Sequence, residues 1–216
     1  AKRGAAFTKL GNMIAIAARG GTDPTTNSSL ALAIEKARAA NMPNANIQRA
    51  IDRINDKNAA ALEEAVYEGY GPGGVGIIIE TATDNKNRTY PEVRTALTKN
   101  GGTMADSGSV MFQFARKGVI RVAASGEEAL LTVLDAGAED AVEEDGGLTV
   151  YTDKKELAKV REALLAAGMT VEDAELQYVP NNTVAIEDDE TARKLTKIID
   201  ALEALDDVTN VATNAA

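Results

Sequence analysis

Few side chains in this sequence could carry out covalent chemistry. The chain has neither cysteine nor histidine, which removes the thiolate nucleophile, the thiolate zinc site and the commonest general base. The hydroxyls of Ser107-Gly108-Ser109 therefore lack a histidine partner, and no strand–turn–helix pattern surrounds them. The acid clusters Glu143-Glu144-Asp145 and Asp188-Asp189-Glu190 fit a hairpin turn and a helix start, without the alternating oxygen ligands of a calcium loop. We therefore predict no enzymatic activity, no metal site and no small-molecule substrate.

A glycine-rich run formally matches a cofactor motif. Residues 69–74 have the G-x-G-x-x-G spacing of a dinucleotide fingerprint. That fingerprint must open a helix whose N-terminus binds the pyrophosphate, whereas this run contains Pro72 and leads into an apolar strand at 75–80. We predict a preformed loop and no cofactor. Within the loop, Tyr70 either offers its ring to a nucleic-acid base or packs against the protein.

Charge is distributed unevenly along the chain, whose net value is −10. Residues 1–60 contain nine Lys/Arg and four Asp/Glu, whereas residues 61–216 contain fourteen and twenty-nine. A basic head on an acidic body suits a protein that binds a polyanion with one part and repels it elsewhere, although an ordinary solvated surface is the alternative. The candidate nucleic-acid contacts in the head are Lys2, Arg3, Lys9, Arg19, Lys36, Arg38, Arg49, Arg53 and Lys57.

Three short helices are expected to carry these cations. Apolar residues recur at three- and four-residue steps over residues 7–17, and Gly20-Gly21 ends that helix. A second helix is expected after a cap at Asn27-Ser28, and a third has Pro43 in its first turn. The apolar face of the third helix consists of Ile47, Ile51 and Ile54.

Two groups of cations are placed where a phosphate could bind. Arg49, Arg53 and Lys57 follow at i, i+4 and i+8 on the third helix, so they form one basic stripe. Lys86 and Arg88 stand at the start of a later helix, where the helix dipole prefers anions. Either a phosphate or a neighbouring Asp or Glu must offset these two charges, and both alternatives remain open at this point.

Beyond the head, the residue pattern indicates two α+β domains. Residues 117–179 show the order β-α-β-β-α-β of a ferredoxin-like fold. The flanking segments supply strands at 75–80, 110–114, 183–187 and 208–213 and helices at 87–100 and 189–205, the first capped by Asn87, in the same order. We therefore expect an α+β protein: an N-terminal three-helix bundle followed by two ferredoxin-like βαββαβ domains, one inserted into the other. The expected domains are 1–60, 61–116 plus 180–216, and 117–179.

The cytoplasm is the expected location of the protein. The sequence contains no apolar run that approaches the ~20 residues of a membrane helix. It also lacks the pattern of a signal peptide. A membrane is therefore not an expected partner.

Several long motifs occur in a characteristic order over nearly the whole chain. They are Ala1-Lys2-Arg3-Gly4, Phe7-Thr8-Lys9-Leu10, Ala33-Ile34-Glu35-Lys36-Ala37, Asn41-Met42-Pro43, Tyr67-Glu68-Gly69-Tyr70-Gly71-Pro72-Gly73-Gly74, Thr83-Asp84-Asn85-Lys86-Asn87-Arg88-Thr89, Glu92-Val93-Arg94, Lys99-Asn100-Gly101-Gly102, Gly108-Ser109-Val110, Ala136-Gly137-Ala138-Glu139-Asp140 and Ile199-Asp200-Ala201-Leu202-Glu203. In these strings the chain resembles the YebC/PmpR family. Members usually carry a further basic segment with His and Trp ahead of the equivalent of Ala1, which the printed sequence lacks.

The resemblance implies a basic three-helix domain, two α+β domains and one of two functions. Some family members are described as DNA-binding transcriptional regulators. Others, including the similar mitochondrial translational activator of cytochrome c oxidase, act on translation at the ribosome, and bacterial relatives are linked to relief of stalls at proline runs. The expected partners are accordingly DNA or rRNA, with the ribosome as a further candidate, because Lys and Arg stripes serve both kinds of target.

Overall fold

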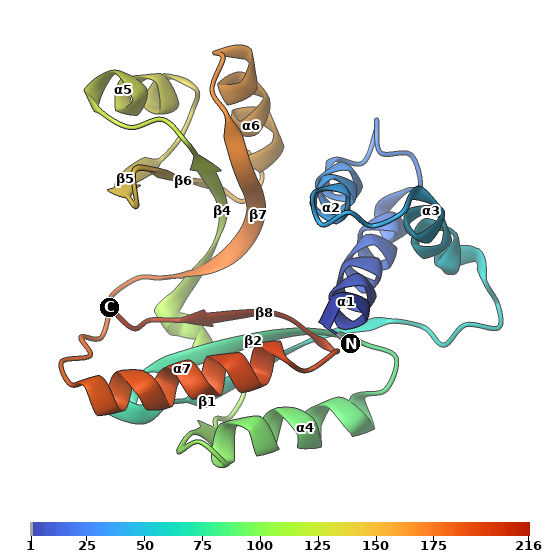
Figure 1. Ribbon diagram of the computed structural model, residues 1–216, viewed down its shortest axis with the longest axis vertical. Coiled ribbons are helices and arrows are strands. Elements are labelled where there is room, and N and C mark those ends of the chain that lie inside the picture. The colour runs from blue at the N-terminus through green and yellow to red at the C-terminus, as the bar shows by residue number, and fades with distance from the viewer. Residues whose placement is uncertain (1) are drawn as a thin grey trace. The chain divides into compact units, whose positions relative to one another are not determined.

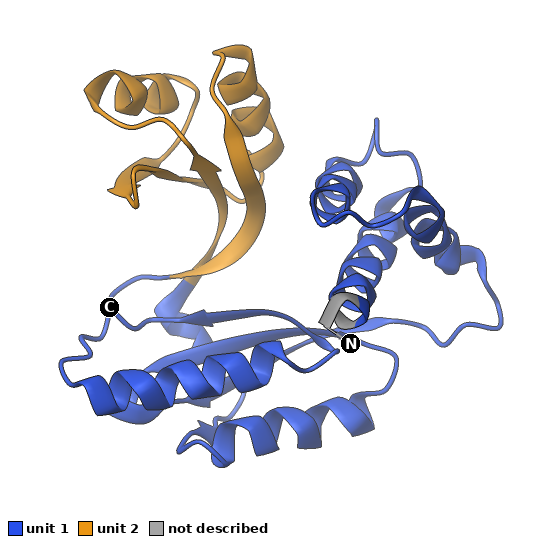
Figure 2. Cartoon of the chain, viewed as in Figure 1, with its two compact units in different colours: residues 1–114, 180–216 blue, residues 115–179 orange. Residues whose placement is uncertain are grey.

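A computed structural model describes the chain from Lys2 to Ala216, apart from the side chains of Lys2, Arg3 and Ala5. The predicted roles of Lys2 and Arg3 therefore lie outside the described residues. The chain forms two compact units, one of residues 1–114 and 180–216 and the other of residues 115–179 (Figure 2). The predicted separation of residues 1–60 from the first α+β domain stays a prediction.

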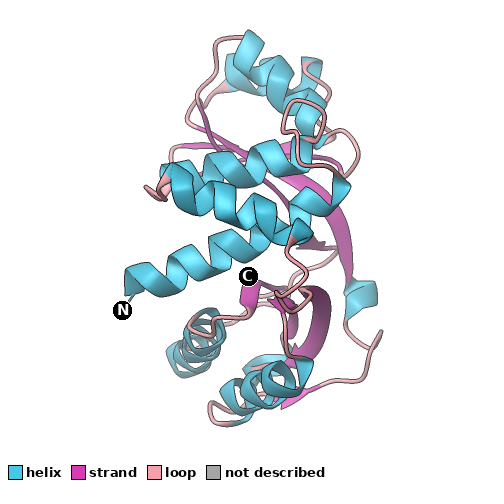
Figure 3. Cartoon of the chain, turned by 90° about the vertical axis from the view of Figure 1, so that its right-hand side faces the viewer, coloured by secondary structure: helices cyan, strands magenta, loops and turns pink. Residues whose placement is uncertain are grey.

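The N-terminal part of the first unit is a bundle of three helices, α1 (Lys2–Ala17), α2 (Ser28–Ala39) and α3 (Asn44–Asp52) (Figure 3). Gly21 follows α1 with φ of 136°, a value that favours glycine, and so ends the helix there. Asn27 caps α2, because its side chain accepts a hydrogen bond from the Leu30 amide at 3.2 Å. The core of the bundle contains Ile14, Leu30, Ile34, Ile47 and Ile51, all buried.

The third helix is shorter than the predicted basic stripe requires. It ends at Asp52 and continues only as a 3-10 turn, Arg53–Asn55. Ile54, which we expected on the apolar face, is 42% exposed. Lys57 lies in the turn beyond, so the predicted i, i+4, i+8 stripe is wrong. Residues four apart share one face only while the chain stays α-helical. Helix α3 ends at Asp52, before Arg53 and Lys57.

The first unit also contains a four-stranded antiparallel sheet in the order β3-β1-β2-β8. Helices α4 (Lys86–Thr98) and α7 (Asp189–Glu203) lie on one face of it (Figure 1). Their fully buried side chains Leu97, Ile198 and Leu202 pack against β2, and each such burial contributes about 1.5–3 kcal/mol. The strands are β1 (Glu63–Tyr70), β2 (Gly76–Thr83), β3 (Thr103–Met104) and β8 (Val208–Thr213).

The order of elements in this sheet differs from the prediction at four places, one of which is the unpredicted short strand β3. Strand β1 is absent from the prediction, so that the chain enters the sheet as a β1–β2 hairpin whose turn is the glycine run with its 3-10 turn Pro72–Gly74. Residues 110–114 form a 3-10 turn, Met111–Gln113, instead of a strand. Residues 183–187 make one isolated bridge, Val184 to Ala215, instead of a strand. The conformation of these segments depends on tertiary contacts, which their own residue pattern does not specify.

The second unit has the predicted chain order β-α-β-β-α-β. Its antiparallel sheet has the order β5-β6-β4-β7, and its core contains Ile120, Val133, Leu148, Val150 and Leu164, all fully buried. The α+β fold class is therefore confirmed. The elements are β4 (Phe114–Val122), α5 (Glu127–Asp135), β5 (Asp140–Glu144), β6 (Gly147–Asp153), α6 (Leu157–Ala166) and β7 (Val171–Pro180).

Candidate nucleic-acid interface

Three of the predicted cations lie near the two ends of α2. Arg19 follows α1, and the Asn27 amide group donates to the Ala17 carbonyl at 2.8 Å, which holds that turn beside the start of α2. Lys36 and Arg38 occupy the last turn of α2, where cations also complement the helix dipole. The helix has 12 residues and is therefore about 18 Å long. The basic surface thus extends over a length comparable to several phosphates of a nucleic-acid strand.

Four of the bundle cations are available to a ligand. Arg19, Arg38, Arg49 and Lys57 are exposed. No carboxylate within the described part of the chain forms an ion pair with Arg19, Arg38 or Lys57. Arg49 donates only to neighbours on its own helix, to the Asn46 side-chain oxygen at 2.6 Å and the Ala45 carbonyl at 3.4 Å. These side chains can exchange water or a local contact for a phosphate at little cost.

Lys9 has a structural contact instead. Its ammonium group donates to the carbonyl of Glu203, the last residue of α7. Burial lowers the pKa of Lys9, against the opposing effect of the nearby Glu203 and Asp206 carboxylates. A cation at the C-terminus of a helix stabilises the helix dipole. Lys9 therefore joins the bundle to the α+β part of the same unit.

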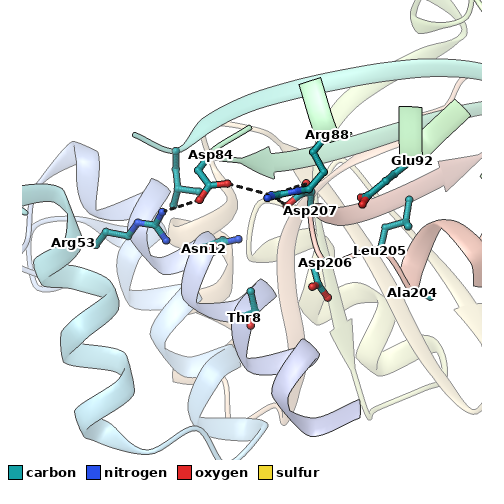
Figure 4. Close-up of a pocket in the computed structure, with 11 residues that line it drawn as sticks. Thr8, Asn12, Arg53, Asp84, Arg88, Glu92, Ala204, Leu205, Asp206 and Asp207 are labelled. Atoms are coloured by element: carbon teal, nitrogen blue, oxygen red, sulfur yellow. Dashed lines mark hydrogen bonds and ion pairs between the residues drawn. The ribbon is translucent and has the colours of Figure 1, made fainter. Parts of the chain in front are cut away.

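A polar cleft of about 470 Å³ opens beside this contact (Figure 4). Four carboxylates and two guanidinium groups line it, so it is not a basic pocket. It lies within the first unit, between α1 of the bundle and the loops that begin α4 and β8. The lining residues are Thr8, Asn12, Arg53, Leu62, Asp84, Arg88, Glu92, Ala204, Leu205, Asp206 and Asp207.

A chain of ion pairs crosses the cleft. Arg53 approaches Asp84 at 3.8 Å, and Arg88 approaches the other oxygen of Asp84 at 3.1 Å. Arg88 also donates twice to Asp207, from Nη2 to Oδ1 at 2.8 Å and from Nε to Oδ2 at 3.1 Å. Asp207 is only 4% exposed and accepts a further hydrogen bond from Thr89 Oγ1 at 2.7 Å. The hydrogen bond to Asp207, followed by its negative charge, raises the pKa of Arg88.

The two cations at the start of α4 therefore have acidic neighbours. Lys86 pairs with Glu63 at 3.4 Å, and Arg88 pairs with Asp84 and Asp207. This is the neighbouring-acid alternative that the residue pattern left open. The cap of α4 also lies two residues earlier than predicted, because Asn85, and not Asn87, accepts the Arg88 amide, at 3.3 Å.

Glu68 has a structural role that the prediction missed. Its side chain is 4% exposed and accepts three backbone N–H groups of one loop, from Gly108 at 2.6 Å, Met111 at 2.6 Å and Val110 at 2.9 Å. Desolvation raises its pKa, but the three donors together more than offset this, so the pKa of the carboxyl is lowered. In the sequence, the signal that could have pointed to Glu68 is weak: it is an acidic residue among glycines and aromatic residues.

Tyr70 lies at the end of the same strand, apart from the helices of the bundle. It is 37% exposed, and its hydroxyl donates to the Ser109 carbonyl at 3.4 Å, in the loop that Glu68 holds. The described site residues consequently fall into four groups: the exposed bundle cations, half-buried Lys36 in the last turn of α2, the cations paired with acids or a helix end, and Tyr70 beside the Glu68 loop.

Comparison with known proteins assigns the chain to a family. Residues 1–57 match the model of the TACO1/YebC protein N-terminal domain, and residues 62–215 match that of the TACO1/YebC second and third domain. A "Probable transcriptional regulatory protein" of Moorella thermoacetica is 50% identical, with 99% of this chain and 88% of the relative covered. A protein of the same description from Lactobacillus gasseri is 46% identical over 100% and 91%.

A solved structure has the same fold. The crystal structure of a conserved hypothetical protein from Aquifex aeolicus superposes with a TM-score of 0.93 at 43% identity, covering 100% of this chain and 91% of that one. In the described part of the chain, no helix is both long and apolar enough to cross a bilayer. The chain thus belongs to the TACO1/YebC family, and the relatives compared carry the name "Probable transcriptional regulatory protein".

Proposed function

We propose that the protein is a non-enzymatic, cytoplasmic regulator of gene expression that binds nucleic acid, with DNA as its target, through the cations of the bundle. The observation that carries the proposal is the set of exposed cations of the bundle, of which Arg19, Arg38 and Lys57 pair with no acid in the described chain. The remainder of the protein is strongly acidic and would repel a polyanion. The names of the relatives agree with a regulatory role.

The function requires neither a cofactor nor a small-molecule substrate. Its chemistry is the exchange of phosphate counterions for Lys and Arg side chains, which contributes sequence-independent affinity. The acid-lined cleft beside α1 is a poor phosphate site, because its guanidinium groups are already paired with carboxylates. We therefore assign phosphate binding to the outer surface of the bundle and a structural role to Lys9, Arg53, Lys86 and Arg88.

A second candidate, structured RNA of the ribosome, is favoured by one feature of the same surface. Reading of DNA sequence requires side chains of one helix to reach base edges in the major groove. The exposed cations are instead spread over the two ends of α2 and over α3, an arrangement suited to backbone contacts with a folded RNA. In this alternative the protein assists translation, including elongation at proline-rich sequences, as its family resemblance suggests.

The test is a titration of the whole protein with duplex DNA and with a folded rRNA fragment at several salt concentrations. The variant Arg19→Gln, Arg38→Gln, Lys57→Gln removes three exposed cations from the bundle. The control Lys154→Gln, Lys155→Gln, Lys197→Gln removes three exposed cations elsewhere, with the same change in net charge.

The bundle variant should bind more weakly and lose about 0.9 of the logarithmic salt slope for each DNA phosphate contact removed. The control should bind like the natural sequence. Equal losses in the two variants would show that net charge alone matters and would refute the assignment to the bundle. Tighter binding of the rRNA fragment than of DNA at equal salt would select the RNA alternative.

A further inference from the structure

The sheet of the second unit has one face that its own helices do not cover. Ile120 of β4 and Leu148 and Val150 of β6 are fully buried on the helix side. Gly118, which shares their face, is so close to Leu157 of α6 that an added Cβ would lie 3.0 Å from the leucine Cβ. Successive residues of a strand point to opposite faces, so the residues between these form an open face.

The register of the strands defines this open face. Val119 of β4 lies opposite Tyr151 of β6, and Tyr151 lies opposite Asp140 of β5. In the next row Thr149 lies opposite Val142, which is 40% exposed. Val119 and Tyr151 are half-buried. An apolar strip of Val119, Tyr151 and Val142 therefore runs diagonally across three strands, within the reach of cross-strand neighbours.

The charges of the open face are predominantly negative. Asp140, Glu144 and Asp153 point to it from β5 and β6. Its two cations are already engaged: Lys117 pairs with Glu139 at 3.1 Å, and Arg121 donates to the Asp145 carbonyl at 3.2 Å and also to the Glu144 carbonyl. Desolvation, followed by the charges of Glu144 and Asp140, raises the pKa of the Tyr151 hydroxyl.

The whole unit has the same sign of charge. Residues 115–179 contain fourteen Asp/Glu and seven Lys/Arg. A nucleic acid would be repelled by this surface, whereas a positively charged chain would be attracted and oriented by it. An apolar strip bordered by carboxylates on the same face matches a segment rich in both aliphatic and basic residues, because the long stems of Lys and Arg let their charged groups reach past packed aliphatic side chains to the carboxylates around them.

We propose that the open face of the second unit, Val119, Tyr151 and Val142 with the carboxylates of Asp140, Glu144 and Asp153, binds a basic, aliphatic-rich segment of a partner protein. The aliphatic side chains of the segment pack on the strip, and its Lys or Arg side chains reach the surrounding carboxylates. This surface is separate from the phosphate-binding bundle and does not depend on it. It allows the protein to hold a basic protein and a nucleic acid with different units.

The test uses the full chain and a fluorescent peptide composed of lysine and leucine. Two matched pairs of variants separate the open face from the rest of the unit. Val119→Ser with Tyr151→Ser removes the strip, and Leu131→Ser with Leu134→Ser removes two exposed leucines of α5 as a control. Asp140→Asn with Asp153→Asn removes charge from the face, and Glu127→Gln with Glu128→Gln removes it from α5.

Both open-face variants should weaken peptide binding on the order of tenfold, while both α5 controls bind like the natural sequence. A glutamate–leucine peptide should not bind. Equal losses in face and control variants, or equal binding of the acidic peptide, would overturn the proposal. The proposal would also be overturned if the natural protein self-associated and the open-face variants alone did not, since the face would then bind a second copy of the chain. If the serine variant fails to fold, the Asn variant, which keeps the apolar strip, decides the question.

Discussion

Replacing Glu68 by glutamine removes one charge from a carboxylate that is only 4% exposed. One oxygen of Glu68 accepts the Val110 and Met111 amides and the other accepts the Gly108 amide. Glutamine has the same shape, but its NH2 group must face at least one of these N–H donors. One buried donor then lacks a partner, which costs about 1–3 kcal/mol, and the other two bonds lose charge assistance of about 1 kcal/mol each. The free energy of unfolding should fall by about 3–5 kcal/mol.

The effect should also depend on pH. Because the pKa of Glu68 is lowered in the folded state, its contribution to stability is complete above the unfolded value of about 4.3. It is lost as the pH falls through the lower folded value, where the carboxyl becomes protonated. The natural protein should therefore lose stability in acid faster than Glu68→Gln, and the difference between the two should narrow below about pH 4.3.

Urea-induced unfolding followed by circular dichroism measures both effects. Glu64→Gln is the control, since Glu64 lies on the same strand but is exposed. It should change the free energy of unfolding by no more than about 0.5 kcal/mol, as surface substitutions usually do. Equal free energies for Glu68→Gln and Glu64→Gln at neutral pH would refute the reasoning, because the three N–H groups would then not depend on a carboxylate.

Two further substitutions test the cations that have acidic or carbonyl partners. Changing both Lys86 and Arg88 to Gln should lower the free energy of unfolding by about 1–3 kcal/mol, because buried Asp207 loses its charged donor while the exposed Lys86–Glu63 pair adds little. A higher thermal midpoint together with weaker nucleic-acid binding would contradict this and would support a phosphate at the start of α4. Lys9→Met should lower the free energy of unfolding by about 0.3–1 kcal/mol, since α7 loses the cation at its C-terminus. An unchanged thermal midpoint would show that this contact contributes nothing.

The sequence predicted the elements whose determinants are local. The three helices of the bundle follow from apolar residues at helical spacing, from Asn27 as a cap and from Gly21 as a stop. The second unit follows from strand and helix periods in the order β-α-β-β-α-β. The first sheet was predicted less well, because β1 contains Glu63, Glu64 and Glu68 and has no clean alternation, and its pairing with β2 stabilises it.

The charge asymmetry, the absence of cysteine and histidine and the family resemblance were determined by the sequence alone, since they require no knowledge of contacts. The candidate site was only partly predictable. Sequence places Arg53 and Arg88 on basic segments, but tertiary structure gives them the carboxylates of Asp84 and Asp207, the latter 119 residues from Arg88. Tertiary structure likewise brings the Lys9 ammonium group to the carbonyl of Glu203 at the end of α7, 194 residues away in the sequence. Whether a cation is free for a phosphate depends on such distant partners, and no local pattern encodes them.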